Sequence, residues 1–180
     1  MFYKVVMIPN KALKTVASLV EEDEFGENLE RVMSNMAQTM YGNNGVGLAG
    51  NQVGLLKRVL VADIGEKYGT DLAKMVNPVI VESSEETAEM EEGCLSLPGF
   101  FINVKRPLWV SVEYRDPQGG HHKENFVGAQ AHVVQHEIDH LEAITLLDQS
   151  SYHKKRYLKK LKKLAKKYPD AAAIMERLRQ

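Results

Sequence analysis

The most constraining feature of the sequence is the run His136-Glu137-Ile138-Asp139-His140, which lies in a stretch with a helical pattern. Two histidines four residues apart lie on one face of a helix, so both imidazoles can bind a single cation. Glu137 lies beside them and can accept a proton from water bound to that cation. Alternatively, the two histidines are ordinary surface or core residues of a helix. The spacing indicates a metal site whose third ligand must come from another part of the chain.

A catalytic metal site usually has three protein ligands and one open position. Downstream candidates fail, because Leu146 occupies the position of a third histidine in one protease pattern and residues 150–167 contain no glutamate. The single cysteine, Cys94, lies upstream in Glu92-Gly93-Cys94-Leu95-Ser96. A lone cysteine is more often an inert buried residue. A thiolate with two imidazoles nevertheless suits Fe²⁺, Zn²⁺, Ni²⁺ or Co²⁺, so Cys94 is the candidate third ligand beside His136 and His140.

His132 lies one helical turn before His136 and forms a second pair with ligand spacing. The pair His136 and His140 is preferred because only this pair encloses a glutamate that can act as a base. His132 is then expected to line a pocket or to support the ligands. The remaining histidines lie in a turn and in a basic helix and are expected to be exposed to solvent: His121, His122 and His153.

A length of 180 residues predicts one domain with one core. Apolar residues at helical spacing predict a helix over 26–41, with a core-facing stripe formed by Leu29, Val32, Met33, Met36 and Met40. Strands are expected over 57–63, 75–82 and 107–115, with a loop over the acidic stretch 83–92 and an interstrand turn over 116–120. Turns and short helices are expected over 10–22. Two further helices are expected over 128–142 and 150–167, followed by an amphipathic tail over 170–179. This order predicts an α+β fold with mostly antiparallel sheets around a central metal-binding helix, followed by a C-terminal helix.

The stretch Gly45–Gly54 contains four glycines, which indicates a backbone that approaches a ligand closely. It lacks the Gly-Lys-Ser/Thr sequence of a phosphate-binding loop, and Gln52 offers an amide donor instead.

Charge is distributed unevenly along the chain, although the formal net charge is only −1. Residues 1–151 carry 12 Lys/Arg and 22 Asp/Glu, whereas residues 152–168 carry nine Lys/Arg and no acidic residue. The basic segment is either a solvated helix face or a surface that docks on RNA or an acidic protein. The single cysteine excludes an internal disulfide, and no apolar run approaches the roughly 20 residues of a membrane span.

Three motifs together resemble those of the peptide deformylase family: Gly45–Gln52, Glu92–Ser96 and Gln135–Leu141. The resemblance covers about residues 4–150 and includes Pro9–Leu13 and Val104–Pro107. It implies a catalytic domain over 1–150 and a basic helical extension over 151–180.

Two positions depart from the family pattern. Gly50 stands where alanine is common, and Ala143 stands where glycine is common. Both changes exchange one small residue for another, and they bear on loop flexibility, substrate preference and subgroup.

The resemblance implies removal of the N-formyl group from the N-terminal methionine of new polypeptides. Cys94, His136 and His140 would hold one Fe²⁺, which Zn²⁺, Ni²⁺ or Co²⁺ can replace. Glu137 would take a proton from water and deliver it to the leaving amine, while Gln52 and the backbone N–H of Leu95 would bind the oxyanion.

The substrate is expected to contact two groups of residues. Val46, Gly47 and Gly93 would lie beside its backbone, and the methionine pocket would be lined by Val46, Met90, Ala129, His132 and Val133. Because apolar residues are common at the position of His132, this pocket is expected to have a more polar wall. Glu92 and Arg106 are candidates for an ion pair that steadies the Cys94 segment, and Asp139 is expected to bond either the backbone or Arg106.

The resemblance also implies a cytoplasmic enzyme of a bacterium or phage, with an organelle as the other location. The basic helix 152–168 would dock on the ribosome, and no membrane is involved. Two alternatives use the same residues differently: a zinc endopeptidase with His136, Glu137 and His140, and a non-catalytic module that binds through its basic helix.

Overall fold

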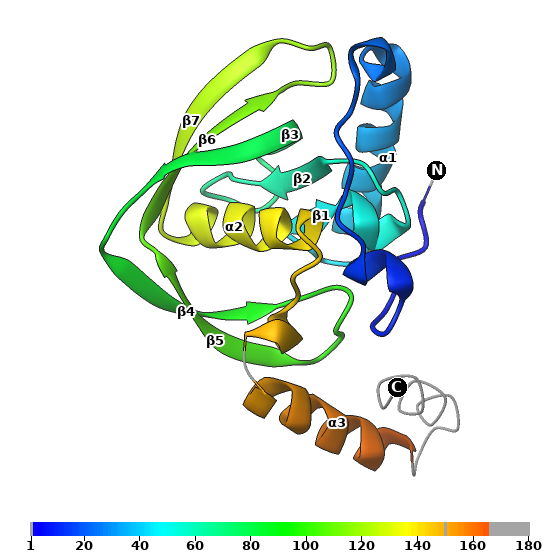
Figure 1. The fold of residues 1–180 in the computed structure, drawn as a ribbon, viewed down its shortest axis with the longest axis vertical. Helices are drawn as coiled ribbons and strands as arrows, with labels where there is room; N and C mark the ends of the chain where they lie inside the picture. The colour runs from blue at the N-terminus through cyan, green and yellow to red at the C-terminus, as the bar shows by residue number, and fades with distance from the viewer. Residues whose placement is uncertain (1, 150, 166–180) are drawn as a thin grey trace.

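Helix α2 (Ala129–Leu141) lies at the centre of the molecule, between a five-stranded sheet and a two-stranded sheet (Figure 1). The computed structural model describes residues 2–149 and 151–165. Nine of the 13 residues of α2 are buried, as required of a helix that is covered on several sides. The predicted α+β fold around a central helix is therefore confirmed.

The larger sheet is antiparallel throughout, with the strand order β1-β2-β3-β6-β7. Its strands are β1 (Gly47–Ala49), β2 (Val59–Asp63), β3 (Leu72–Ser83), β6 (Trp109–Arg115) and β7 (His121–Val127). The three predicted strands correspond to β2, β3 and β6. The predicted turn joins β6 to β7, and Asp116 Oδ1 accepts hydrogen bonds from the backbone N–H groups of Gln118 and Gly120, both at 2.9 Å.

The prediction of a loop over 83–92 is wrong for most of that stretch. Residues Thr87–Gly93 form β4, which pairs antiparallel with β5 (Phe101–Pro107) in the smaller sheet. Most residues of β4 are exposed and three of its seven residues are acidic, so the strand lacks the apolar alternation that usually reveals one. Its pairing depends instead on β5, whose alternate residues Ile102, Val104 and Arg106 are buried.

Helix α1 (Glu27–Gly42) covers β1 and β2 and confirms the predicted helix. Leu29, Met33, Met36 and Met40 of the predicted stripe are buried in one apolar cluster, and Val32 packs against it. The helix ends at Gly42, two residues before Asn44, which has a positive φ of 55°.

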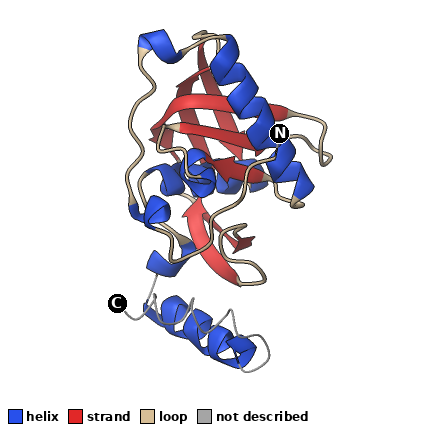
Figure 2. Ribbon diagram, turned by 90° about the vertical axis from the view of Figure 1, so that its right-hand side faces the viewer, coloured by secondary structure: helices blue, strands red, loops and turns tan. Residues whose placement is uncertain are grey.

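Helix α3 (Ser151–Ala165) follows the body of the molecule and projects from it (Figure 2). Its Tyr157 is buried and packs edge-on against Phe100, with ring centroids 5.1 Å apart. Arg156 lies over the same Phe100 ring. The predicted tail over 170–179 and the last two residues of the predicted helix lie outside the described residues.

Four short 3₁₀ helices complete the described part: η1 (Lys11–Lys14), η2 (Glu22–Glu24), η3 (Gly50–Val53) and η4 (Leu146–Asp148). The first lies in the region 10–22 predicted to contain turns and short helices, and the second begins at the last residue of that region. None of the helices in residues 2–149 and 151–165 is long and apolar enough to span a membrane.

Candidate metal centre

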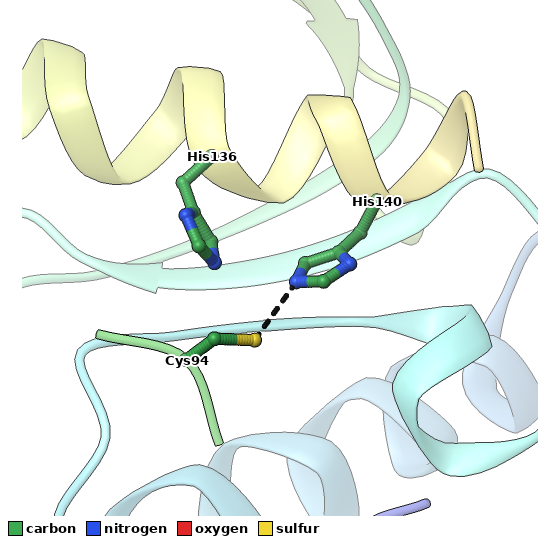
Figure 3. A group of neighbouring side chains, drawn as sticks. All are labelled: Cys94, His136 and His140. Carbon is green, nitrogen blue, oxygen red and sulfur yellow. Dashed lines mark hydrogen bonds between the residues drawn. The ribbon is translucent and has the colours of Figure 1, made fainter. Parts of the chain in front are cut away.

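The two histidines of the His-Glu-x-x-His run lie on one face of α2 and point in the same direction (Figure 3). His136 is 8% exposed and His140 is 1% exposed. Their rings meet edge-on with centroids 4.9 Å apart. Burial lowers the pKa of His140 well below its usual value, and the positive charge of Arg106 lowers it further. The His140 ring is therefore neutral, as a metal ligand must be.

Cys94 immediately follows β4, and its side chain points toward both rings (Figure 3). Its Sγ lies 3.2 Å from Nε2 of His140. The ligand atoms of Cys94, His136 and His140 all lie within 4.8 Å of one another. The structure thus brings together the three residues that the sequence singled out, two from one helix and one from the end of a strand.

The carboxylate of Glu92 fixes the orientation of His136. Nδ1 of His136 lies 2.9 Å from Oε2 of Glu92, and Arg106 donates to both carboxylate oxygens, at 2.6 and 3.0 Å. Arg106 also donates to Asp139 at 2.8 Å. Both predicted partners of Arg106 are therefore confirmed. Burial raises the pKa of Glu92, but the hydrogen bonds from His136 and Arg106 outweigh it and lower the pKa to about 2.

Glu137 has a different environment from Glu92. It is 4% exposed, and its Oε2 has no hydrogen-bond partner among the described residues. Burial raises its pKa to about 7, and the negative charge of Glu92 acts in the same direction. Gly47 on β1 allows this approach, because a Cβ at that position would lie 2.8 Å from Cδ of Glu137. The pKa of this carboxyl group is thus close to neutral pH, so the group can both accept and return a proton.

Gln52 lies in η3 and directs its amide NH₂ toward the cysteine. Its Oε1 accepts a hydrogen bond from the backbone N–H of Ala49 at 2.7 Å, which leaves Nε2 on the other side of the amide. Nε2 lies 3.5 Å from Sγ of Cys94 and 3.4 Å from Oγ of Ser96. Leu95, which follows Cys94, is half-buried. Gln52 and Leu95 therefore both adjoin the third candidate ligand.

The residues fit a transition-metal ion. One thiolate and two imidazoles form a donor set for Fe²⁺, Zn²⁺, Ni²⁺ or Co²⁺. Among the described residues, five buried side-chain polar atoms lack a partner, and four of them belong to the metal-ligand residues or their neighbours: Asn51 Oδ1, His132 Nε2, Glu137 Oε2 and His140 Nδ1. Such a concentration of unsatisfied groups is typical of a functional site.

The residues expected to contact substrate occupy varied environments. Val46, Met90, Gly93 and Ala129 are exposed, Val133 is half-buried, and Gly47 and His132 are buried. His132 directs Nδ1 toward Oε1 of Glu92, at 2.8 Å. The predicted exposure of His121 and His122 is confirmed, and the side chain of His153 is outside the described part of the chain.

Sequence reasoning missed Asn51. Its Nδ2 donates a hydrogen bond to the backbone carbonyl of His140, which links η3 to the end of α2. The only signal in the sequence was its position beside Gln52 in the glycine-rich stretch.

Comparison with known proteins gives one consistent result. The family model of polypeptide deformylase matches residues 2–156. The peptide deformylase of Fusobacterium nucleatum is 40% identical, with 98% of each chain covered, and that of Erythrobacter litoralis is 38% identical, with coverage of 89% of this chain and 96% of the relative. The crystal structure of peptide deformylase from Ehrlichia chaffeensis superposes with a TM-score of 0.81 at 33% identity, covering 91% of this chain and 96% of that one.

Proposed function

The chain belongs to the polypeptide deformylase family and is a hydrolase that removes the N-formyl group from new polypeptides, and we propose how its residues perform this reaction. Water cleaves the formyl C–N bond, which yields formate and a peptide with a free N-terminal methionine. The observation that carries the proposal is the convergence of Cys94, His136 and His140, with the buried carboxyl of Glu137 on the same helix.

In this proposal, Cys94, His136 and His140 hold one metal ion. A divalent ion bound there would polarise the formyl carbonyl and lower the pKa of water. Fe²⁺ is the proposed physiological ion, and Zn²⁺, Ni²⁺ or Co²⁺ would replace it, because the mixed sulfur and nitrogen donor set favours these ions over Mg²⁺ or Ca²⁺.

Glu137 is the proposed general base and acid. Its carboxylate takes a proton from the attacking water, and the oxygen of that water bonds to the formyl carbon. Glu137 then delivers the proton to the amide nitrogen as the C–N bond breaks. Its burial, its pKa of about 7 and its unpartnered Oε2 support this role.

Gln52 and Leu95 are the proposed oxyanion donors. Negative charge develops on the formyl oxygen during the attack, and aligned N–H groups stabilise it. The position of Nε2 of Gln52, 3.5 Å from Sγ of Cys94, supports its part in this role. The backbone N–H of Leu95 lies at the residue after Cys94, beside the same centre.

We propose that the substrate backbone lies beside the metal centre, near the exposed residues Val46 and Gly93 and the buried Gly47. The methionine side chain would then enter a pocket with five lining residues: Val46, Met90, Ala129, His132 and Val133. The exposure of Val46, Met90 and Gly93 supports access for an extended peptide.

Metal content distinguishes this function from the alternatives. We expect Cys94→Ala to lose most bound metal and activity, because one of three protein ligands is removed. Ser111→Ala, which changes a buried side chain on β6, is the matched control and is expected to retain metal. Full metal content in Cys94→Ala, measured by elemental analysis, would favour an endopeptidase site without the cysteine. Metal binding without formate release would favour a non-catalytic module.

The division of the chain into a catalytic part over 1–150 and an extension over 151–180 remains our proposal. We also propose that the basic segment 152–168 docks on the ribosome through RNA phosphates and that the enzyme acts in the cytoplasm. The charge pattern supports docking, since none of the nine basic residues is balanced by an acidic residue within the segment.

A further inference from the structure

His132 is a buried imidazole that takes no part in the proposed proton transfer or metal binding, although it is also a proposed lining residue of the methionine pocket. The residue is 3% exposed and lies one turn before His136 on α2. Its Nδ1 lies 2.8 Å from Oε1 of Glu92, while Nδ1 of His136 lies 2.9 Å from Oε2 of the same carboxylate. One carboxylate is therefore shared between a candidate metal ligand and a histidine that is not a ligand.

The hydrogen bonds have a defined direction. Glu92 is paired with Arg106 and is ionised, so its two oxygens only accept hydrogen bonds. The ring nitrogen that faces Glu92 must therefore carry hydrogen in His132 as well as in His136. In His136 this arrangement leaves Nε2 available to a metal ion, as in the carboxylate–histidine pairs that orient metal ligands.

Four hydrogen bonds hold the carboxylate of Glu92, two from Arg106 and one from each histidine. Arg106 anchors it to the neighbouring strand β5, and the histidines anchor it to α2. Contact with His136 alone would give Glu92 one attachment to the helix. The second contact, one turn away, fixes the carboxylate along the helix axis and thereby restrains rotation of the His136 ring.

Glu92 also lies on β4, two residues before Cys94, which immediately follows this strand. Its attachment to α2 therefore influences the separation between the cysteine and the two histidine ligands. We propose that His132 is a positioning residue: it locks Glu92 and so sets the affinity of the metal centre and the rate of deformylation. This inference rests on the proposed function of Cys94, His136 and His140.

The test compares His132→Leu, which removes the donor but retains bulk, with His132→Asn, whose side-chain NH₂ lies near the position of Nδ1. Val134→Ala on the same helix is the control, because it alters a buried side chain of the core behind α2. Each protein is titrated with Co²⁺ against a competing chelator, and the thiolate–Co²⁺ absorption band is recorded. We expect His132→Leu to lose about 10-fold in Co²⁺ affinity, the lower end of the loss that is typical when a partner of a metal ligand is removed, because Glu92 keeps its bonds to Arg106 and His136.

We expect His132→Asn to recover most of the Co²⁺ affinity and the wild-type absorption band. Val134→Ala should lower thermal stability but leave Co²⁺ affinity unchanged. In steady-state assays with formyl-Met peptides, His132→Leu should lower kcat, and the altered wall of the methionine pocket should change KM by a smaller factor. A His132→Leu protein with wild-type Co²⁺ affinity and kcat would overturn the inference, as would a His132→Asn protein that is impaired equally.

Two further outcomes separate the positioning role of His132 from a role only in the methionine pocket and from a failure of the proposed function. If His132→Leu changes KM according to the first side chain of the substrate but keeps Co²⁺ affinity and kcat, His132 serves only as a wall of the methionine pocket and the positioning role is wrong. If the wild-type protein itself binds no Co²⁺ and releases no formate, the proposed function fails, and the inference fails with it. An active wild type with an unaffected His132→Leu variant contradicts the positioning role alone.

Discussion

Two buried glutamates near the metal centre have opposite environments. Burial raises the pKa of Glu92, but the hydrogen bonds from His136 and Arg106 outweigh it and lower the pKa to about 2. Glu137 has an oxygen without a partner, and burial raises its pKa to about 7. The first environment keeps a permanent negative charge that orients other groups, whereas the second lets a carboxyl group exchange a proton near neutral pH.

The side-chain amide of Gln52 is a proposed oxyanion donor, and its removal can be tested. We expect Gln52→Leu to reduce kcat about 10²- to 10³-fold, because an oxyanion donor is lost while the metal ligands stay in place. The measurement is formate release at saturating substrate, together with metal content. Gln130→Leu is the control, since the Gln130 amide bonds the carbonyl of Ile64 and not Cys94. An unchanged kcat in Gln52→Leu would exclude the proposed role.

Single residues differ in how far the sequence predicts their roles. The ligand candidates on α2 follow from helical spacing, and the Glu92–Arg106 pair was among the expected contacts. The link from Asn51 to the carbonyl of His140 was not predictable, because it joins residues 89 positions apart. It requires η3 to pack against the end of α2, and the spacing of apolar residues within each element does not indicate which elements pack together.

At the level of elements, the end of α2 contains an unusual alanine. Ala143 has a φ of 61°, a left-handed conformation that favours glycine. Its N–H bonds the carbonyl of His140, and the N–H of Ile144 bonds that of Asp139. This pattern is a Schellman motif, in which glycine is the usual residue at this position.

We expect Ala143→Gly to stabilise the protein by up to about 1 kcal/mol. Relief of the left-handed strain, worth about 1–2 kcal/mol, exceeds the greater entropy that glycine gives the unfolded chain. The measurement is the free energy of unfolding in urea. Ala131→Gly, in the buried middle of α2, is the control and should be destabilising. A lower stability for Ala143→Gly would mean that the alanine methyl group makes compensating contacts.

Strand β4 shows why one element escaped prediction. Segments rich in acidic residues, serine and threonine are typical of loops, and only Glu92 of this strand is buried. The strand forms because its backbone pairs with β5 along its whole length and because Glu92 meets Arg106. The deciding interactions therefore lie in the partner strand and not in the local sequence.

In the whole molecule, the metal centre and the cluster of basic residues lie in different parts of the chain. The acidic body holds the metal centre, and α3 carries basic residues that are exposed, including Lys154, Lys155 and Lys159. The buried Tyr157 anchors this helix on Phe100, six residues after Cys94. A partner bound to α3 would therefore be held close to the side of the molecule that carries the metal ligands.

The basic segment predicts ribosome binding that depends strongly on salt. Each phosphate contact releases counterions, so affinity should fall steeply as salt concentration rises. Co-sedimentation with ribosomes is measured for the full chain and for a chain truncated after Asp148, at low and at physiological salt. The full chain should bind at low salt, and the truncated chain should not. Equal binding by both chains would exclude this docking surface.

The central claim is that Glu137 moves the proton at a metal centre formed by Cys94, His136 and His140. The most direct test measures formate release from a formyl-Met peptide by Fe²⁺- or Ni²⁺-loaded wild type and Glu137→Gln, with metal content measured in both. We predict an active wild type and a Glu137→Gln protein that keeps its metal but loses at least about 10²-fold in kcat. An inactive metal-loaded wild type, or a fully active Glu137→Gln, would contradict the claim.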